Sequence, residues 1–295
     1  MASSNSFDQF ISDEIEKGKG LYVPVKASRF ERMFVKWHDC KDLHPNPDDE
    51  FSDPAIGPSY RIISDYEREF RDKLKKGEQP INDPLIVGKV HPEGYMLING
   101  HHRWAAALKV EIKKVPIKII NMMSDEELQR IVESSQHDKR VTMDLDEVVF
   151  KSKWDNYVEK ETGFHFGSKI KKKMMLGIPA LFNYLTTHGY DIFVYSSEFY
   201  SIDDIRRYFD RFFVHVDGII TGTGKKNVKF SESQKTVMNL IKNKYAKTIH
   251  IDNDSVICTH SGTGEFEEYD LEVPGSLWSK KVIEIIEKID APPTE

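Results

Sequence analysis

Apolar positions along the second half of the chain follow two different spacings. Short runs of consecutive apolar residues, which suit buried strands, are separated by longer segments whose apolar residues recur at helical spacing. Strands and helices that alternate over short connections are typical of a parallel sheet with crossover helices. The predicted strands are residues 141–144, 190–195 and 247–251, and residues 214–220 are a strand or a turn. The predicted helices are residues 176–187, 203–212, 233–243 and 277–289. Residues 255–275 show neither spacing and are predicted to be irregular.

The first half of the chain has a different pattern, in which short strands dominate. Residues 84–90 and 95–98 are apolar runs separated by a turn that contains proline and glycine, so they predict a β-hairpin. The second strand leads through a glycine turn into an alanine-rich helix, and residues 114–120 predict a further strand. Residues 41–59 hold four prolines and predict a long loop. The pattern therefore predicts an α+β domain in front of an α/β domain.

A predicted helix between the halves marks the domain boundary. Ser124 and Glu127 have the spacing of a capping box, and the residues after them give the helix an apolar stripe. We therefore divide the chain into a first domain at residues 1–122, a helical linker at 123–137 and a second domain at 138–295.

Composition restricts the compartment and the partners. Of the 295 residues, 39% are hydrophobic and 31% are charged, and no apolar run reaches the ~18 residues that a membrane helix needs. The start of the chain lacks a basic segment followed by an apolar one, so no signal peptide is predicted. The two cysteines lie far apart and favour a reducing compartment over a disulfide framework, which predicts a cytoplasmic protein without a membrane partner. The net charge of −6 disfavours non-specific binding to nucleic acid.

Two carboxylates stand two positions apart at the first strand of the second domain. If that strand continues through Asp144 and Asp146, alternation places both side chains on one face of the sheet. Such a pair attracts a divalent cation, or divides the work of nucleophile and general acid/base. The plainer interpretation is a strand that ends in a turn, where aspartate is common.

Polar residues also end two further strands of the predicted parallel sheet. Ser196 follows residues 190–195, and Asp252 and Asp254 follow residues 247–251. In open α/β sheets, ligands bind at the carboxyl ends of the strands. Three strands that end in Asp or Ser at one edge therefore favour a catalytic site over unrelated strand ends.

A second group of candidate residues lies at the glycine turn of the first domain. Asn99, Gly100, His101, His102 and Arg103 stand where a strand passes into a helix. Unpaired N–H groups and the positive end of the helix dipole, together with imidazole and guanidinium groups, suit a phosphate. The alternative is a helix start whose polar side chains only face water. That alternative is less favoured because cationic groups oppose the dipole at this end.

Four lysines form a third cluster, in a basic stretch of the second domain. They are predicted to be a solvated face, and steering of an anionic substrate is the alternative. The four are Lys169, Lys171, Lys172 and Lys173.

The hairpin, the stretch Ile98-Asn-Gly-His-His-Arg-Trp104 and the following strand resemble the ParB/sulfiredoxin-like domain, over roughly residues 20–120. Members of this family bind nucleotides at that turn, and the Gly-His-His-Arg form most resembles the free-serine kinases, which use ADP or ATP. The resemblance implies that His101, His102 and Arg103 contact phosphates. Sulfiredoxins carry a catalytic cysteine where this chain has His101, so the resemblance disfavours sulfinic-acid repair.

Residues 138–290 resemble the haloacid dehalogenase (HAD) superfamily, whose four motifs are matched in order. Glu147 departs from the pattern, because many members carry Gly or Thr at that position. The motifs are Asp144-Leu-Asp146-Glu-Val148, Ile192-Phe-Val-Tyr-Ser196, a lysine best matched by Lys235 with Lys229 as the alternative, and Ile249-His-Ile-Asp252-Asn-Asp254.

The HAD resemblance implies a Rossmann-like domain with a minimal cap and a Mg²⁺-dependent phosphoryl transfer. Asp144 would form an aspartyl-phosphate, and Asp146 would protonate the leaving oxygen and then activate water. Ser196 and Lys235 would bind the phosphoryl oxygens. The metal would be held by Asp144, the backbone carbonyl of Asp146, and Asp252 or Asp254.

Three functions follow from these patterns. The leading hypothesis is a HAD-type phosphohydrolase or phosphotransferase that acts on a phosphorylated small molecule or nucleotide and carries a nucleotide-binding first domain. The second is a nucleotide-dependent kinase of a small hydroxylated substrate, with its site at the turn from Gly100 to Arg103. The third is a nucleotide-gated DNA-binding protein, which the acidic net charge disfavours.

Overall fold

The computed structural model describes residues 2–53, 55–151, 155–160, 169–223 and 232–292. The chain forms two compact units that divide between Asn121 and Met122. Each unit has its own sheet and its own hydrophobic core, and the architecture is mixed α/β. None of the helices that the described residues form is long and apolar enough to cross a bilayer.

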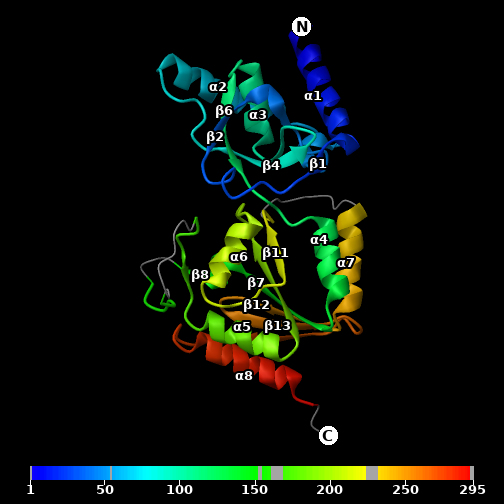
Figure 1. The fold of residues 1–295 in the computed structure, drawn as a ribbon, viewed down its shortest axis with the longest axis vertical. Coiled ribbons are helices and arrows are strands. Elements are labelled where there is room, and N and C mark those ends of the chain that lie inside the picture. Colours follow the sequence, from blue (N-terminus) through cyan, green and yellow to red (C-terminus); the bar gives the residue numbers. More distant parts are fainter. Residues whose placement is uncertain (1, 54, 152–154, 161–168, 224–231, 293–295) are drawn as a thin grey trace. The chain divides into compact units, whose positions relative to one another are not determined.

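A mixed sheet forms the centre of the first unit. The predicted hairpin is confirmed, since β4 and β5 pair antiparallel, whereas β6 pairs parallel with β4 on its other side. Short β1 also pairs with β4. The path through the sheet is β2 (Lys36–Asp39), β6 (Lys114–Ile119), β4 (Leu85–His91), β5 (Tyr95–Asn99) and β3 (Leu43–His44), with β1 at Val23–Pro24 (Figure 1).

Helix α3 packs against this sheet, and most of the side chains on its buried face are small. Three consecutive alanines and Trp104 are fully buried, and the Trp104 indole donates a hydrogen bond to the carbonyl of Cys40. The long loop predicted over residues 41–59 also contains β3 and a short 3₁₀ turn. The helices of this unit are α1 (Ala2–Leu21), α2 (Tyr60–Lys75) and α3 (His101–Lys109), with 3₁₀ turns at Cys40–Asp42 and Glu50–Ser52.

The second unit contains the parallel sheet that the sequence predicts. Four neighbouring strands of this sheet are parallel, with β7 and β10 in the middle. Along the chain, β10 and β11 follow β7 and lie on one side of it, and β12 comes later and pairs with its other side. The full order is β11 (Gly218–Thr221), β10 (Tyr190–Ser196), β7 (Lys139–Asp144), β12 (Lys247–Ile251), β13 (Ser255–His260) and β14 (Phe266–Asp270).

The prediction that residues 255–275 are irregular is wrong. Strands β13 and β14 form an antiparallel extension of the sheet beyond β12. Val256 and Cys258 are fully buried, but Ile257 between them is also apolar, so this short run shows no alternation in the sequence.

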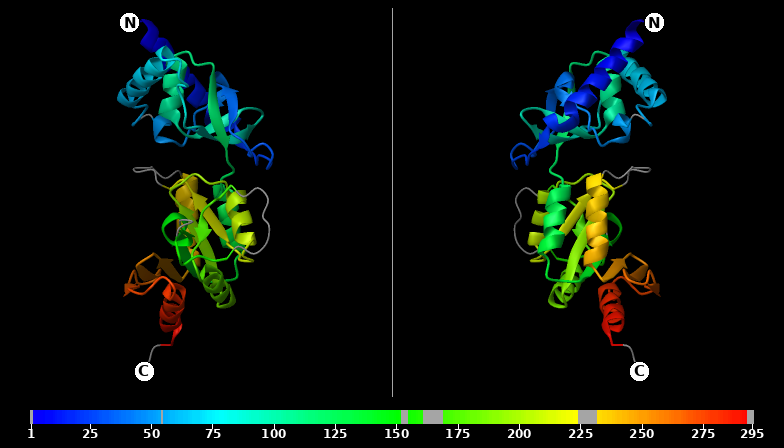
Figure 2. Two further views of the ribbon diagram at one scale, coloured as in Figure 1. Left: turned by 90° about the vertical axis from the view of Figure 1, so that its left-hand side faces the viewer. Right: turned by 90° about the vertical axis from the view of Figure 1, so that its right-hand side faces the viewer.

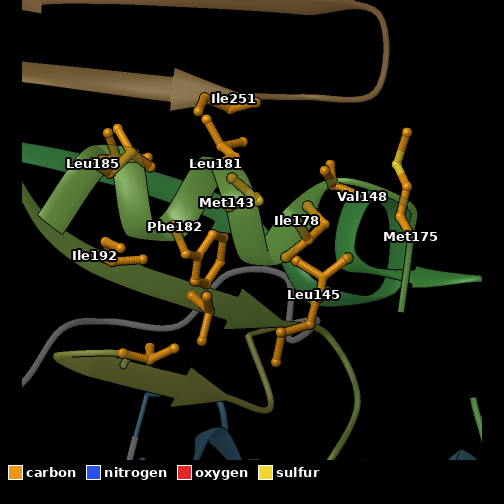
Figure 3. Close-up of a cluster of buried hydrophobic side chains, with 14 of the residues drawn as sticks. Met143, Leu145, Val148, Met175, Ile178, Leu181, Phe182, Leu185, Ile192 and Ile251 are labelled. Atoms are coloured by element: carbon orange, nitrogen blue, oxygen red, sulfur yellow. The ribbon is translucent and has the colours of Figure 1, made fainter. Parts of the chain in front are cut away.

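Helices cover both faces of the second sheet, and the strand residues alternate between them. Ile192 and Val194 of β10 belong to the larger core with α5, α6 and α8, whereas Phe193 packs with α4 and α7. Figure 2 shows α4 and α7 side by side, and Figure 3 shows side chains of the larger core. The helices are α4 (Asp125–Ser134), α5 (Ile178–Thr187), α6 (Ile202–Asp210), α7 (Glu232–Lys244) and α8 (Trp278–Asp290).

The predicted linker, residues 123–137, contains α4. Ser124 caps this helix by accepting a hydrogen bond from the Glu127 amide, which is the first half of the predicted capping box. Leu128 and Val132 are buried in one cluster with residues of β10 and α7. The helix therefore packs as part of the second unit.

The predicted strand through Asp146 ends earlier than expected. Strand β7 stops at Asp144, and residues Leu145–Val149 form one turn of π-helix. The Asp144 carboxylate accepts hydrogen bonds from the amides of Asp146 and Glu147, so it caps this turn. The two carboxylates therefore do not share a strand face. The chain then forms β8 (Phe150–Lys151), which pairs with β9 (Lys173–Met174).

Candidate functional site

The carboxyl ends of β7, β10 and β12 bring the predicted acidic residues to one edge of the second sheet. In the parallel register, Ile251 pairs with Met143 on one side of β7, and Tyr195 pairs with Asp144 on the other. Asp252 and Ser196, which follow these residues, therefore flank the end of β7. The strands that follow β7 in the chain lie first on one side of it and then on the other. In α/β sheets, ligands bind at the carboxyl ends of the strands where the order switches in this way.

Asp146 is the most densely contacted carboxylate at this edge. Its Oδ2 accepts a hydrogen bond of 2.5 Å from the hydroxyl of Ser196. Its Oδ1 accepts one of 2.8 Å from the Lys172 ammonium and one of 3.1 Å from the Tyr200 hydroxyl. Burial alone would raise the pKa of Asp146, but these donors outweigh it, so the pKa lies below its ordinary value of 3.8. Asp146 is therefore ionised at neutral pH.

Lys172 lies at this site rather than on a solvated face. Its side chain is 43% exposed, and its Nζ lies over the rings of Phe150 and Tyr200 at 5.6 and 5.9 Å from their centroids. Neither Lys172 nor Tyr200 could be distinguished in the sequence. Lys172 is one of several neighbouring lysines, and Tyr200 carries no spacing signal relative to Asp146.

Asp144 and Asp252 are the two predicted metal ligands that follow adjacent strands of the sheet. Mg²⁺ is commonly bound by one or two carboxylates while water and substrate oxygens complete its shell. Asp254 is exposed, and the carboxylate of Asp146 is already occupied by its three donors. Within the described part of the chain, no three His, Cys, Asp or Glu side chains gather as a metal site.

The two candidate phosphate-binding lysines have different positions in the structure. Lys235 is exposed in the first turn of α7, and Lys229 lies outside the described residues. Among the residues that the structure describes, Lys172 contacts the Asp146 carboxylate.

The glycine turn of the first unit forms the start of α3 as predicted. Gly100 is the N-cap residue, with a φ of 99° in the left-handed region, and no side chain caps the helix. A Cβ at this position would lie 2.7 Å from the Cδ2 of Leu85 and 3.1 Å from the Nη2 of Arg103. The absence of a side chain therefore gives the turn its conformation and its close packing.

The two histidine rings of the turn bind the loop of residues 45–59. The amide of Asn46 donates to His101 Nε2 at 3.2 Å, and the amide of Ser59 donates to His102 Nε2 at 3.0 Å. His101 is buried, with its Nδ1 3.5 Å from the carboxylate of Asp49. The histidines therefore hold an acidic loop against the start of α3. That these rings contact a phosphate stays a prediction.

Burial and charge act in opposite directions on His102. Burial lowers its pKa, the nearby Asp49 and Glu50 raise it, and the net value lies below the ordinary 6.5. His102 is therefore neutral at neutral pH, which its role as a hydrogen-bond acceptor requires.

Arg103 is the cation of the turn. Its Nη1 donates at 2.6 Å to both the carbonyl and the carboxylate of Asp83, and its Nη2 lies 3.4 Å from Asn99 Oδ1. The Arg103 side chain is only 12% exposed, whereas that of Asp83 is 82% exposed. The guanidinium is thus fixed beside the start of α3, and an anion can compete for it with an exposed carboxylate.

Comparison with known proteins identifies relatives of the N-terminal part. Residues 68–135, from within α2 to the end of α4, match the ParB N-terminal domain family. An ATP-dependent L-serine kinase from Desulfurococcus mucosus is 33% identical over 60 residues, which are 20% of this chain. The match spans 23%, or about a quarter, of the length of that kinase.

Two solved structures are also similar to the chain. One is a truncated ParB from Caulobacter crescentus with CTP-γ-S, at 20% identity and a TM-score of 0.25, over 36% of this chain and 56% of that one. The other is a free serine kinase with AMP, at 13% identity and a TM-score of 0.24, over 85% of this chain and 95% of that one. The family match confirms that the N-terminal part is similar to ParB N-terminal domains, as its sequence motifs indicate.

Proposed function

We propose that the first unit binds a nucleotide such as ATP or ADP and transfers a phosphoryl group to the hydroxyl of a small molecule. The observation that carries this proposal is the similarity to an L-serine kinase, together with a family match that includes the turn from Asn99 to Arg103. Of the two enzyme activities predicted from the sequence, the kinase is the one that these relatives support.

The geometry of the turn suits this chemistry. The start of α3 has no side-chain cap, so its dipole and amides would favour a phosphate there, and Arg103 adds a fixed positive charge. The loop held by His101 and His102 places carboxylates near the same helix start, with Asp49 in contact with His101. A carboxylate in this loop would accept the proton of the attacking hydroxyl. The oxygen of that hydroxyl bonds to phosphorus while the bond from phosphorus to the nucleoside diphosphate breaks.

A phosphotransfer assay tests the kinase. The full chain is incubated with Mg²⁺, γ-labelled ATP and a panel of small hydroxyl compounds that includes L-serine. Label transfer that is lost in Arg103→Met and retained in Asp144→Asn supports the proposal. Transfer that is lost only in Asp144→Asn contradicts it, because that residue belongs to the second unit.

A second activity is favoured by a specific observation in the second unit. Asp144 ends the central strand, and Asp146 beside it is held by donors from the sheet edge and from the β8–β9 hairpin. We propose that residues 138–295 form a HAD-type phosphohydrolase or phosphotransferase domain. Its substrate would be a phosphorylated small molecule or nucleotide.

Each residue would have one role in this reaction. An oxygen of Asp144 forms a bond to phosphorus while the bond from phosphorus to the leaving oxygen breaks. The fraction of Asp146 that carries a proton, which is small at neutral pH because its pKa is lowered, gives that oxygen its proton. Asp146 then takes a proton from the water that releases phosphate from Asp144. The lowered pKa of Asp146 favours this second, basic step.

Ser196, and Lys235 by resemblance, would bind the phosphoryl oxygens. A magnesium ion at Asp144 and Asp252 would neutralise charge on the transferred group.

Phosphate release tests the second activity. The full chain is assayed with Mg²⁺ on an aryl phosphate and a panel of nucleotides and phosphorylated metabolites. Release that is lost in Asp144→Asn and unchanged in Arg103→Met supports the proposal. Equal release by wild type and Asp144→Asn would overturn it.

A further inference from the structure

We infer that Lys172 is a positioning residue, which holds Asp146 in the orientation for proton transfer at the second-unit site. This inference rests on the phosphohydrolase activity proposed for that unit. It assigns the role to a lysine on the β8–β9 hairpin, a position that none of the four HAD-like motifs includes.

The backbone at Lys172 is fixed by several contacts. The next two residues form β9, where Met174 pairs with Phe150 and both side chains are buried in the core. The Tyr208 hydroxyl donates to the Lys172 carbonyl at 3.3 Å. Because β8 directly follows the turn that contains Asp146 and pairs with β9, this pairing places Lys172 near the carboxylate.

The surroundings of the ammonium group strengthen its contact with Asp146. Nζ lies 2.8 Å from Oδ1, and it lies within 6 Å of the centroids of the Phe150 and Tyr200 rings, which contact each other edge to face. Aromatic faces attract the cation and exclude water, so this pair is less screened than a fully exposed one.

The three donors together restrain the Asp146 carboxylate. Ser196 is fully buried at the end of β10 and holds Oδ2, whereas Lys172 and Tyr200 hold Oδ1 from the hairpin and from the loop after β10. Donors on both oxygens fix the plane of the carboxylate. Of the three donors, Lys172 is the one with a flexible side chain, and its chain neighbour Lys171 is exposed and serves as a matched control.

Steady-state kinetics on an aryl phosphate with Mg²⁺ test this role in the full chain. We expect Lys172→Met to lower kcat by about 10- to 100-fold with KM changed by less than about twofold, because a positioning residue acts on the proton-transfer step. Lys172→Arg should restore most of the loss, and Lys171→Met should behave as wild type. An unchanged kcat, or a raised KM with unchanged kcat, would overturn the inference.

Thermal melts separate failure of this inference from failure of the proposed function. If phosphate release by the wild type does not depend on Asp144, the proposed function is refuted, and the positioning role is refuted with it. The contact itself is tested in Lys172→Met, Asp146→Asn and the double variant. If the pair interacts, their Tm shifts deviate from additivity by roughly 1–3 °C, whereas Lys171→Met and Asp146→Asn add. Additive shifts for the Lys172 pair would refute the contact even in an active enzyme.

Discussion

The hydroxyl of Ser196 donates a hydrogen bond of 2.5 Å to Oδ2 of Asp146, which joins the end of β10 to the turn that follows β7. Ser196 Oγ also accepts a hydrogen bond from the amide of Glu198. The hydroxyl is therefore oriented by the backbone before it reaches the carboxylate. A serine that ends a buried strand acts here as a fixed donor to a residue 50 positions earlier in the chain.

Ser196→Ala should reduce phosphate release by roughly 10- to 100-fold, because it removes a preorganised donor from the proposed acid/base. It should also lower the free energy of unfolding by about 1 kcal/mol, since a half-buried carboxylate oxygen loses its partner. Ser197 is the matched control, because it is adjacent and exposed. If Ser196→Ala and Ser197→Ala release phosphate at the same rate, the hydrogen bond has no part in the reaction.

Arg103→Met should weaken ATP binding by about 10- to 100-fold. A charged hydrogen-bonding group at a phosphate site contributes roughly 1.5–3 kcal/mol, and each 1.4 kcal/mol is a tenfold change in affinity. Calorimetric titration with ATP and Mg²⁺ measures the effect. Arg68→Met is the control, because Arg68 is exposed on α2 and pairs with Asp65 three positions earlier. Equal affinities for both variants would place the nucleotide elsewhere.

The stability of the first unit should fall as the pH drops below about 6.5. The pKa of His102 is lower in the folded protein than its ordinary 6.5, so the unfolded chain binds the proton first. The stabilisation is complete above 6.5 and is lost as the pH falls through the folded-state value. Protonation would also remove the acceptor for the Ser59 amide.

His102→Gln provides the comparison for this pH effect, because glutamine keeps an acceptor and does not titrate. Tm values between pH 5 and 8 should decline less for this variant than for wild type. His215 has the opposite sign, since Asp217 raises its pKa. His215 stabilises wild type and His102→Gln equally at low pH, so the difference between their Tm profiles reports the titration of His102. Parallel profiles would contradict the assignment.

Gly100→Ala should destabilise the protein by about 2–4 kcal/mol. Alanine at a φ of 99° is strained, and its Cβ would overlap the Leu85 side chain at 2.7 Å. Gly77 also has a positive φ of 74° but nothing lies within 4 Å of its added Cβ. Gly77→Ala should therefore cost only about 1 kcal/mol of backbone strain. Urea midpoints measure both, and equal shifts would show that close packing at Gly100 is unimportant.

The strands of the second unit could be predicted because each carries its own signal. Residues 190–195 are apolar except for Asp191, and β10 accordingly runs from Tyr190 to Ser196 and is almost wholly buried. The polar residue that ends such a run marks the edge of the sheet. For this reason Asp144, Ser196 and Asp252 could be expected at one edge before the structure was known.

Other features could not be predicted because they depend on contacts between distant residues. The roles of His101 and His102 depend on amides of Asn46 and Ser59, more than 40 positions away. Strand β14 is mostly exposed and polar, so only its pairing with β13 defines it. The early end of β7 depends on the Asp144 carboxylate, which bonds to amides of the following turn instead of continuing the strand.

The sequence alone determined the parallel strands of the second unit and the helices between them, the hairpin of the first unit and the polar residues at the strand ends. Hydrophobic periodicity and turn chemistry are local properties, and they specify these features wherever the chain folds. Only the tertiary structure decided which donors meet at Asp146 and which groups hold the loop beside α3. Those choices depend on distances between side chains from separate elements, and the packing of the two cores sets these distances.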